Sequence, residues 1–199
     1  MKGRVISNFT PQDKIVSVNN KFGNTNIKNQ QGTTRVIFDS LPLDGSTELR
    51  FFENAGSRQY PFTNIGAEGN RLNVGETFVV QKVYFGIITT DADTGEFDLF
   101  EPINVFGTTD FYNGEWSFLI ANSQVIKQLP FLTSFNPSFA ITANNNVDEA
   151  FATFNDIVIP PLLEYVLTYR INTYTARPNN RLACFIEGTA GIIAPQTTF

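Results

Sequence analysis

One short stretch of this 199-residue chain carries residue types and spacings that could perform chemistry. Residues 93–95 read Asp-Thr-Gly, the triplet in which an aspartic-protease site holds one of its two paired carboxylates. The sequence contains no second copy of this triplet, so the carboxylate that would share a proton with Asp93 is missing. Because residues 91–95 combine Asp and Gly between two apolar runs, we predict a turn between two strands there and no catalytic site.

The same turn has part of the spacing of a calcium-binding loop. Asp91 and Asp93 are separated by one residue, as are the first two ligands of an EF-hand. Position twelve of such a loop requires a bidentate Glu, and here it is Pro102. We therefore predict no metal-binding residues, and a loose surface Ca²⁺ site stays open.

The composition excludes most nucleophilic and metal-dependent enzymes. The chain has no His and a single Cys, Cys184, which lies in an apolar run and is predicted to be a buried thiol. Residues 64–69 and 188–191 contain glycines but lack the Lys-Ser/Thr ending of a phosphate-binding loop, so we predict turns. We expect no catalytic or cofactor-binding residues and no enzyme activity. An acid-only glycosidase-type site stays open, because the sequence alone cannot pair the scattered acids.

Charge is distributed unevenly along the chain, whose formal net charge is −5. Residues 1–35 contain six basic residues and one acid, a net charge of +5, and residues 36–199 have a net charge of −10. A basic segment on an acidic body is expected where one end of a protein faces an anionic surface, either phospholipid or nucleic acid. We expect neither a membrane-spanning segment nor a secretion signal.

The chain as a whole is rich in strand and turn formers. Hydrophobic residues make up 42 % of it, with 20 Phe, and charged residues only 17 %. About a dozen short strands separated by turns predict a sandwich or barrel with much of the Phe buried. A turn at 43–46 predicts a hairpin, and turns at 91–95 and 177–180 join two further pairs of strands. Short helices are predicted over residues 11–18, 123–129 and 148–154.

Two segments share a similar layout. Residues 76–102 and 163–188 each comprise a long strand, a turn and a second strand, and their first residues lie 87 positions apart. This similarity predicts two related β-units in tandem.

The layout resembles a known family. Residues 50–58, 63–65 and 70–80 look like the first half of the jelly-roll capsid proteins of small tailless bacteriophages. The same proteins are similar in layout to two further segments. These are residues 116–122 with a following short helix, and residues 182–194 with Gly188 and Gly191. The resemblance is one of pattern and covers about residues 35–194. It implies a major capsid protein of the double jelly-roll lineage, as in icosahedral phages with an internal membrane.

The expected fold is therefore all-β, with two compact jelly rolls in tandem favoured over a single roll with long loops. The corresponding division is a basic N-terminal arm over residues 1–34, a first roll over residues 35–110 and a second roll over residues 111–199. Because 199 residues are few for sixteen strands, the single roll stays a competing interpretation.

The resemblance also implies partners. Three chains would form a capsomer that tiles an icosahedral shell in the virion, assembled in the host cytoplasm, beside other capsid proteins at the vertices. The arm would face an internal membrane or the genome, without sequence-specific nucleic-acid binding, and we predict that Lys2, Arg4 and Lys14 contact anionic lipid. Loops with Asp91, Asp93 and residues 144–146 would lie on the exterior or at subunit rims. A vertex protein or a lectin-like receptor-binding virion protein is the alternative.

Overall fold

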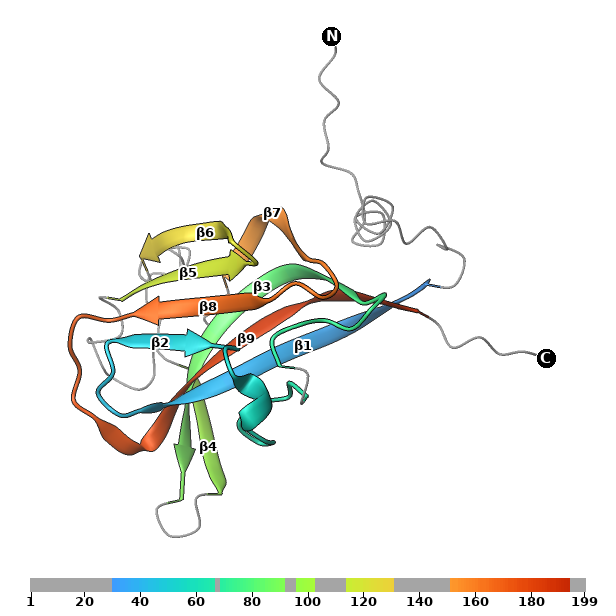
Figure 1. Ribbon diagram of the computed structural model, residues 1–199. Coiled ribbons are helices and arrows are strands. Elements are labelled where there is room, and N and C mark those ends of the chain that lie inside the picture. The colour runs from blue at the N-terminus through green and yellow to red at the C-terminus, as the bar shows by residue number, and fades with distance from the viewer. Residues whose placement is uncertain (1–29, 67–68, 92–95, 103–113, 131–150, 194–199) are drawn as a thin grey trace, which may run out of the picture.

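The chain folds into two antiparallel sheets, so the predicted all-β class is confirmed. The computed structural model describes residues 30–66, 69–91, 96–102, 114–130 and 151–193. One sheet, here called sheet A, has the order β1-β9-β3-β4, and β7 also pairs with β3. Its strands are β1 (Gln30–Leu43), β3 (Thr77–Thr90), β4 (Phe97–Pro102), β7 (Phe151–Ile159) and β9 (Arg177–Ile193). The long strands β1, β9 and β3 cross the whole molecule (Figure 1).

The second sheet, sheet B, is shorter and has the order β2-β8-β5-β6. Its strands are β2 (Glu48–Phe51), β5 (Glu115–Ile120), β6 (Ser123–Pro130) and β8 (Tyr165–Arg170). A single turn of 3₁₀-helix, Ala55–Ser57, follows β2. The two sheets contribute buried side chains to one common core, and so form a sandwich.

The strand pairing is nested. The first described strand pairs with the last, β1 with β9, and β2 pairs with β8. Further in, β3 pairs with β7, and β5 pairs with β6. The strand β4 is an addition to this scheme and pairs antiparallel with β3, which precedes it in the chain. The strand pair predicted around residues 91–95 is therefore confirmed, although residues 92–95 themselves lie outside the described part.

The predicted division at residues 110 and 111 does not separate two sets of strands. Strands from both sides of it pair with one another in sheet A, through β1 and β9, and in sheet B, through β2 and β8. Each sheet therefore contains strands from both sides of residue 110. In addition, residues 30–34, which were predicted to belong to the arm, pair with residues 189–193 as the start of β1.

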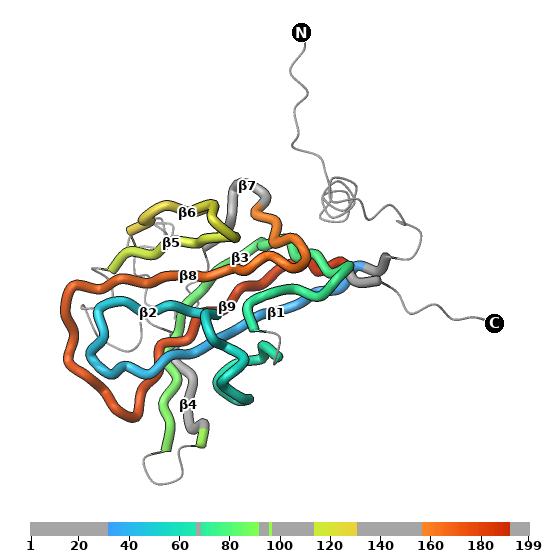
Figure 2. Tube along the Cα trace, in the orientation of Figure 1, coloured from blue at the N-terminus to red at the C-terminus, as the bar shows by residue number. Residues whose placement is uncertain are grey.

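Two connections that were predicted as local turns cross between the sheets instead. Residues 44–47 lead from β1 in sheet A to β2 in sheet B, so they do not close a hairpin. The strand β9 begins at Arg177, which places the predicted turn 177–180 inside it and makes residues 171–176 the crossing from β8. Both crossings lie at the end of the sandwich opposite to the start of β1 (Figure 2). The segments 76–102 and 163–188 therefore differ, because only the first keeps its two strands in one sheet.

Some local propensities are overridden by strand pairing. Residues 123–129 form β6 and not a helix, because they pair with β5 after a two-residue turn. Residues 151–154 likewise belong to β7, and residues 188–191, predicted as a turn, lie within β9. The predicted helix over residues 11–18 lies outside the described residues.

Aromatic side chains fill the centre of the sandwich. The ring of Phe85 lies 5.3 Å from that of Tyr169, 5.9 Å from that of Trp116 and 6.1 Å from that of Phe51, measured between centroids. These rings meet in edge-to-face or tilted geometry, which aromatic pairs prefer. The predicted burial of Cys184 is confirmed, and this burial raises the pKa of its thiol well above the usual value.

The outer edge of sheet A at β1 is covered by the connection between β2 and β3. The side chain of Asn64 accepts from the backbone N–H of Phe38 at 2.8 Å and donates to the carbonyl of Val36 at 2.6 Å. The hydroxyl of Thr63 donates to the carbonyl of Phe38 at 3.0 Å. Free strand edges invite pairing with other chains, and these bonds occupy the edge of β1 instead.

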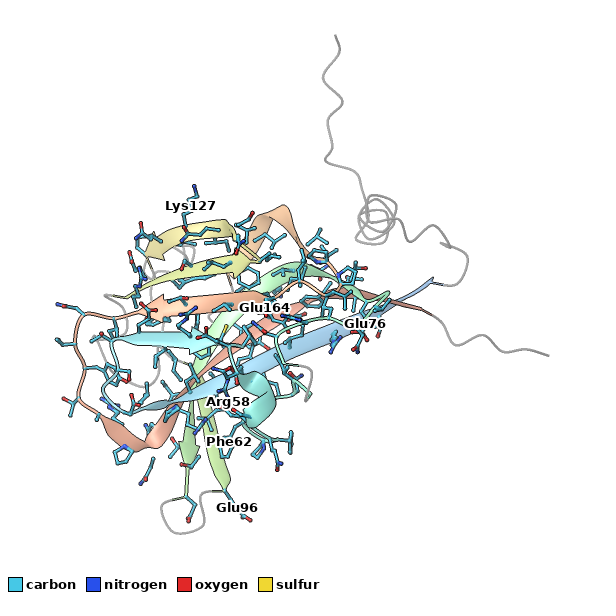
Figure 3. All side chains as sticks on the ribbon, viewed as in Figure 1. Arg58, Phe62, Glu76, Glu96, Lys127 and Glu164 are labelled. Carbon is cyan, nitrogen blue, oxygen red and sulfur yellow. The ribbon has the colours of Figure 1, made fainter. Side chains whose placement is uncertain are left out.

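A buried ion pair also holds the connection between β2 and β3 against β1. Asp39 on β1 is fully buried, and its carboxylate accepts two hydrogen bonds from the guanidinium of Arg58, at 2.6 and 3.0 Å. The same carboxylate accepts from the backbone N–H of Phe52 at 2.7 Å. The guanidinium also donates to the carbonyl of Glu53 at 3.2 Å. Figure 3 shows Arg58 and Phe62 on this connection, next to β1.

Candidate functional site

A cavity of about 370 Å³ opens between the start of β8, the strand β1 and the connection from β2 to β3. Figure 3 labels two of the carboxylates in this region, Glu76 and Glu164. Its lining combines apolar and charged side chains with two glycines: Arg35, Ile65, Gly66, Gly69, Arg71, Leu72, Asn73, Glu76 and Tyr165. Small-molecule sites begin at about this size and combine apolar walls with a few polar groups.

The polar wall of the cavity is held by a tight turn. The backbone N–H of Glu76 donates to the carbonyl of Asn73 at 3.0 Å, and Gly75 within the turn has a φ of 81°. That left-handed conformation favours glycine. The Glu76 carboxylate accepts from the backbone N–H of Asn73 at 3.2 Å and from Arg35 at 3.3 Å. The turn therefore places a carboxylate and a guanidinium together at the rim.

The floor of the cavity is fixed by contacts between two connections. The backbone N–H of Tyr165 donates to the carbonyl of Asn70 at 3.1 Å, and the Asn70 side chain donates back to the carbonyl of Tyr165 at 2.9 Å. The backbone N–H of Leu162 donates to the carbonyl of Leu72 at 2.9 Å. Arg71 forms an ion pair with Glu164 on the neighbouring connection.

Tyr165 is the most deeply buried polar side chain of the lining, with 2 % of its surface exposed. Its ring packs against that of Phe52 at 5.4 Å. Burial raises the pKa of its hydroxyl well above the usual value, Arg35 opposes this rise, and Asp39 and Glu76 add to it. The phenol thus stays protonated and offers a hydrogen-bond donor.

Two large apolar side chains are exposed beside the cavity, and we call them the end patch. Val74 in the tight turn is 73 % exposed, and Leu162 on the connection from β7 to β8 is 56 % exposed. Leu162 has a φ of 62°, a conformation that costs a residue with a Cβ about 1–2 kcal/mol. The end patch therefore presents apolar surface to solvent next to the cavity.

The residues singled out by sequence do not meet at the cavity. Asp91 lies at the end of β3, where its backbone N–H donates to the carbonyl of Glu96 at 2.9 Å, and it is exposed. Lys2, Arg4, Lys14, Asp93 and residues 144–146 lie outside the described part of the chain. Among the described residues there is no cluster of three or more His, Cys, Asp or Glu that could hold a metal ion.

Sequence reasoning missed the cavity for a physical reason. Arg35 pairs with Glu76, which is 41 positions away in the sequence, and Arg71 pairs with Glu164, which is 93 positions away. Only the register of the strands brings the members of each pair together. The glycines of residues 64–69 were the available signal. The backbone N–H of Gly69 donates to the carbonyl of Gly66 at 3.1 Å, and both glycines line the cavity.

No protein-family model, no curated protein and no solved structure matches this chain. Within the described ranges, no helix has the length and apolar character to cross a membrane.

Proposed function

We propose that this chain is a structural virion protein, a capsid subunit built on a single jelly roll. The nested strand pairing supports this most directly. Jelly rolls have eight strands in two sheets, and capsid proteins are among their common uses. Here β1-β9-β3-β7 would be one sheet of the roll and β2-β8-β5-β6 the other. In this arrangement β4 is an addition that follows the third strand of the roll.

The charge distribution supports a defined orientation in a shell. Residues 1–35 carry a net charge of +5, and they precede or begin β1. The start of β1 pairs with the end of β9, so both ends of the roll lie together. We propose that the basic segment faces an anionic interior, either a membrane or the genome, and that copies associate as trimers through the acidic body. No bond-making chemistry is part of this role.

The end patch gives the proposal a surface through which copies can touch. Burial of a large apolar side chain contributes about 1.5–3 kcal/mol, so Val74 and Leu162 would supply the apolar centre of a larger lateral contact. Arg71 and Glu164 lie beside them and provide a polar rim. Protein interfaces commonly have this composition, an apolar centre with charged residues around it.

Replacement of Leu162 by Asn is expected to weaken assembly without harming the fold. Asn tolerates a positive φ and removes the exposed apolar side chain. The concentration needed for assembly, measured by sedimentation velocity with negative-stain images, should rise about tenfold, in line with the loss of roughly 1.4 kcal/mol per contact. The midpoint of thermal unfolding should stay the same or rise.

Two further samples complete this experiment. Tyr60→Ser removes another exposed hydrophobic side chain, 82 % exposed, and should leave assembly unchanged if the end patch is specific. Unaltered assembly of the double variant Val74→Asn and Leu162→Asn would exclude the end patch as a contact.

A wild-type chain that stays monomeric at every concentration would refute the capsid role, and small glycan-binding oligomers would favour the receptor-binding alternative.

The basic segment is expected to bind anionic lipid. Lys2, Arg4 and Lys14 should each contribute on the order of 1 kcal/mol near a charged surface, so deletion of residues 1–20 should abolish most co-flotation with anionic vesicles. Vesicles of neutral lipid serve as the control, and neither protein should float with them. Equal flotation of the full chain and the deletion variant with anionic vesicles would refute the lipid contact.

A further inference from the structure

We propose that the cavity beside the end patch binds a small organic phosphate monoester, of the size of a sugar phosphate. This proposal is independent of the capsid role, since it concerns a ligand site within one subunit. The cavity has about 370 Å³, and its walls offer two guanidinium groups, one phenol and two aliphatic side chains. Nothing in the strand arrangement requires this particular combination.

The donors match a phosphate group. Guanidinium groups bind phosphate oxygens through paired N–H donors, and Arg35 and Arg71 both line the cavity. Tyr165, whose side chain is 2 % exposed, adds a phenol hydroxyl to the same lining. A phenol hydroxyl that stays protonated can donate a hydrogen bond to a phosphate oxygen.

The carboxylates do not cancel this preference. Glu76 is already bonded by Arg35 and by the backbone N–H of Asn73, which offset its charge. Arg71 pairs with Glu164, but both side chains are more than half exposed. Exposed ion pairs of this kind are weak, so Arg71 can exchange its partner for an incoming phosphate. The lining residues therefore include two cations, Arg35 and Arg71, and one carboxylate, Glu76.

The remaining walls indicate an organic group attached to the phosphate. Ile65 and Leu72 are apolar and lie in the same lining as the arginines. Gly66 and Gly69 keep side chains out of the opening, and a Cβ on either would meet no atom within 4 Å. Glu76 keeps an unshared carboxylate oxygen that can accept a hydrogen bond from a sugar hydroxyl.

Isothermal titration calorimetry with ribose 5-phosphate, in a phosphate-free buffer of low salt, tests this site. Ribose 5-phosphate should bind saturably, inorganic phosphate at least about fivefold more weakly, and ribose alone weakest of all. The Tyr165→Phe variant keeps the ring against Phe52 and loses the hydroxyl, so its dissociation constant for ribose 5-phosphate should rise about tenfold. Tyr84→Phe is the matched control, because Tyr84 stacks on Phe185 and does not line the cavity.

Three results would overturn the proposal. They are no saturable binding to the folded protein, equal binding by wild type and Tyr165→Phe, and equal affinity for ribose 5-phosphate and either of its parts. Fluorescence of the buried Trp116 verifies that each variant is folded. Because assembly is measured separately by sedimentation, failure of this proposal and failure of the capsid proposal can be told apart.

Discussion

Replacement of Asp39 by Asn is expected to lower the free energy of unfolding by about 3 kcal/mol, because it breaks a buried ion pair from one side. The carboxylate of Asp39 accepts three hydrogen bonds, two from Arg58 and one from the backbone of Phe52. An amide supplies one acceptor oxygen in place of two, and its NH₂ would face a guanidinium donor. Urea unfolding followed by the fluorescence of Trp116 measures the change.

A surface pair is the matched control for this prediction. Glu48 and Arg170 form an ion pair at 2.9 Å between neighbouring strands, and both side chains are well exposed. Glu48→Gln should therefore change the free energy of unfolding by less than about 1 kcal/mol. If Asp39→Asn lowers the free energy of unfolding no more than Glu48→Gln does, the ion pair between Asp39 and Arg58 does not stabilise the packing of the β2–β3 connection against β1.

Replacement of Gly188 by Ala is expected to destabilise the sandwich by about 3 kcal/mol or more, because the added methyl group has no room. A Cβ on Gly188 would lie 2.0 Å from the carbonyl oxygen of Val79 and 3.0 Å from the ring of Phe78. The obstruction is backbone, so no change of rotamer relieves it, and β3 and β9 would have to separate next to the bulge at Val80 and Lys82.

Gly66→Ala provides the comparison in thermal or urea unfolding. A Cβ on Gly66 meets no atom within 4 Å, and this residue is outside the strands. The substitution should be neutral or stabilise the protein by a few tenths of a kcal/mol, because alanine restricts the unfolded chain. Equal effects of the two substitutions would mean that β9 does not approach β3 as closely as described.

Strand positions could be predicted from the sequence where local pattern was sufficient. The long strand β3, the hairpin to β4 and the burial of Cys184 follow from apolar runs and turn residues. Membership of a sheet could not be predicted in this way. The turn residues at 43–46 look like those of a hairpin, yet β2 finds its partner in β8, more than 100 residues away.

The candidate site was harder to predict than the fold. The spacing of Asp91 and Asp93 is that of a possible catalytic or calcium site, but a surface turn explains the same spacing equally well. The cavity instead depends on Arg35, Glu76 and Tyr165, which come from three distant segments and have no local motif. In addition, the burial of Tyr165 depends on its packing against Phe52, which is more than 100 residues away in the sequence.

The pairing of the first described strand with the last has a consequence for how the protein is made. Among the described strands, β1 pairs only with β9, and β9 also lies between β1 and β3. Sheet A therefore cannot close before residues 177–193 have left the ribosome. Such distant pairing makes folding slow and leaves a nascent chain incomplete. A nascent chain thus leaves β1 without its partner strand until residues 177–193 have been made.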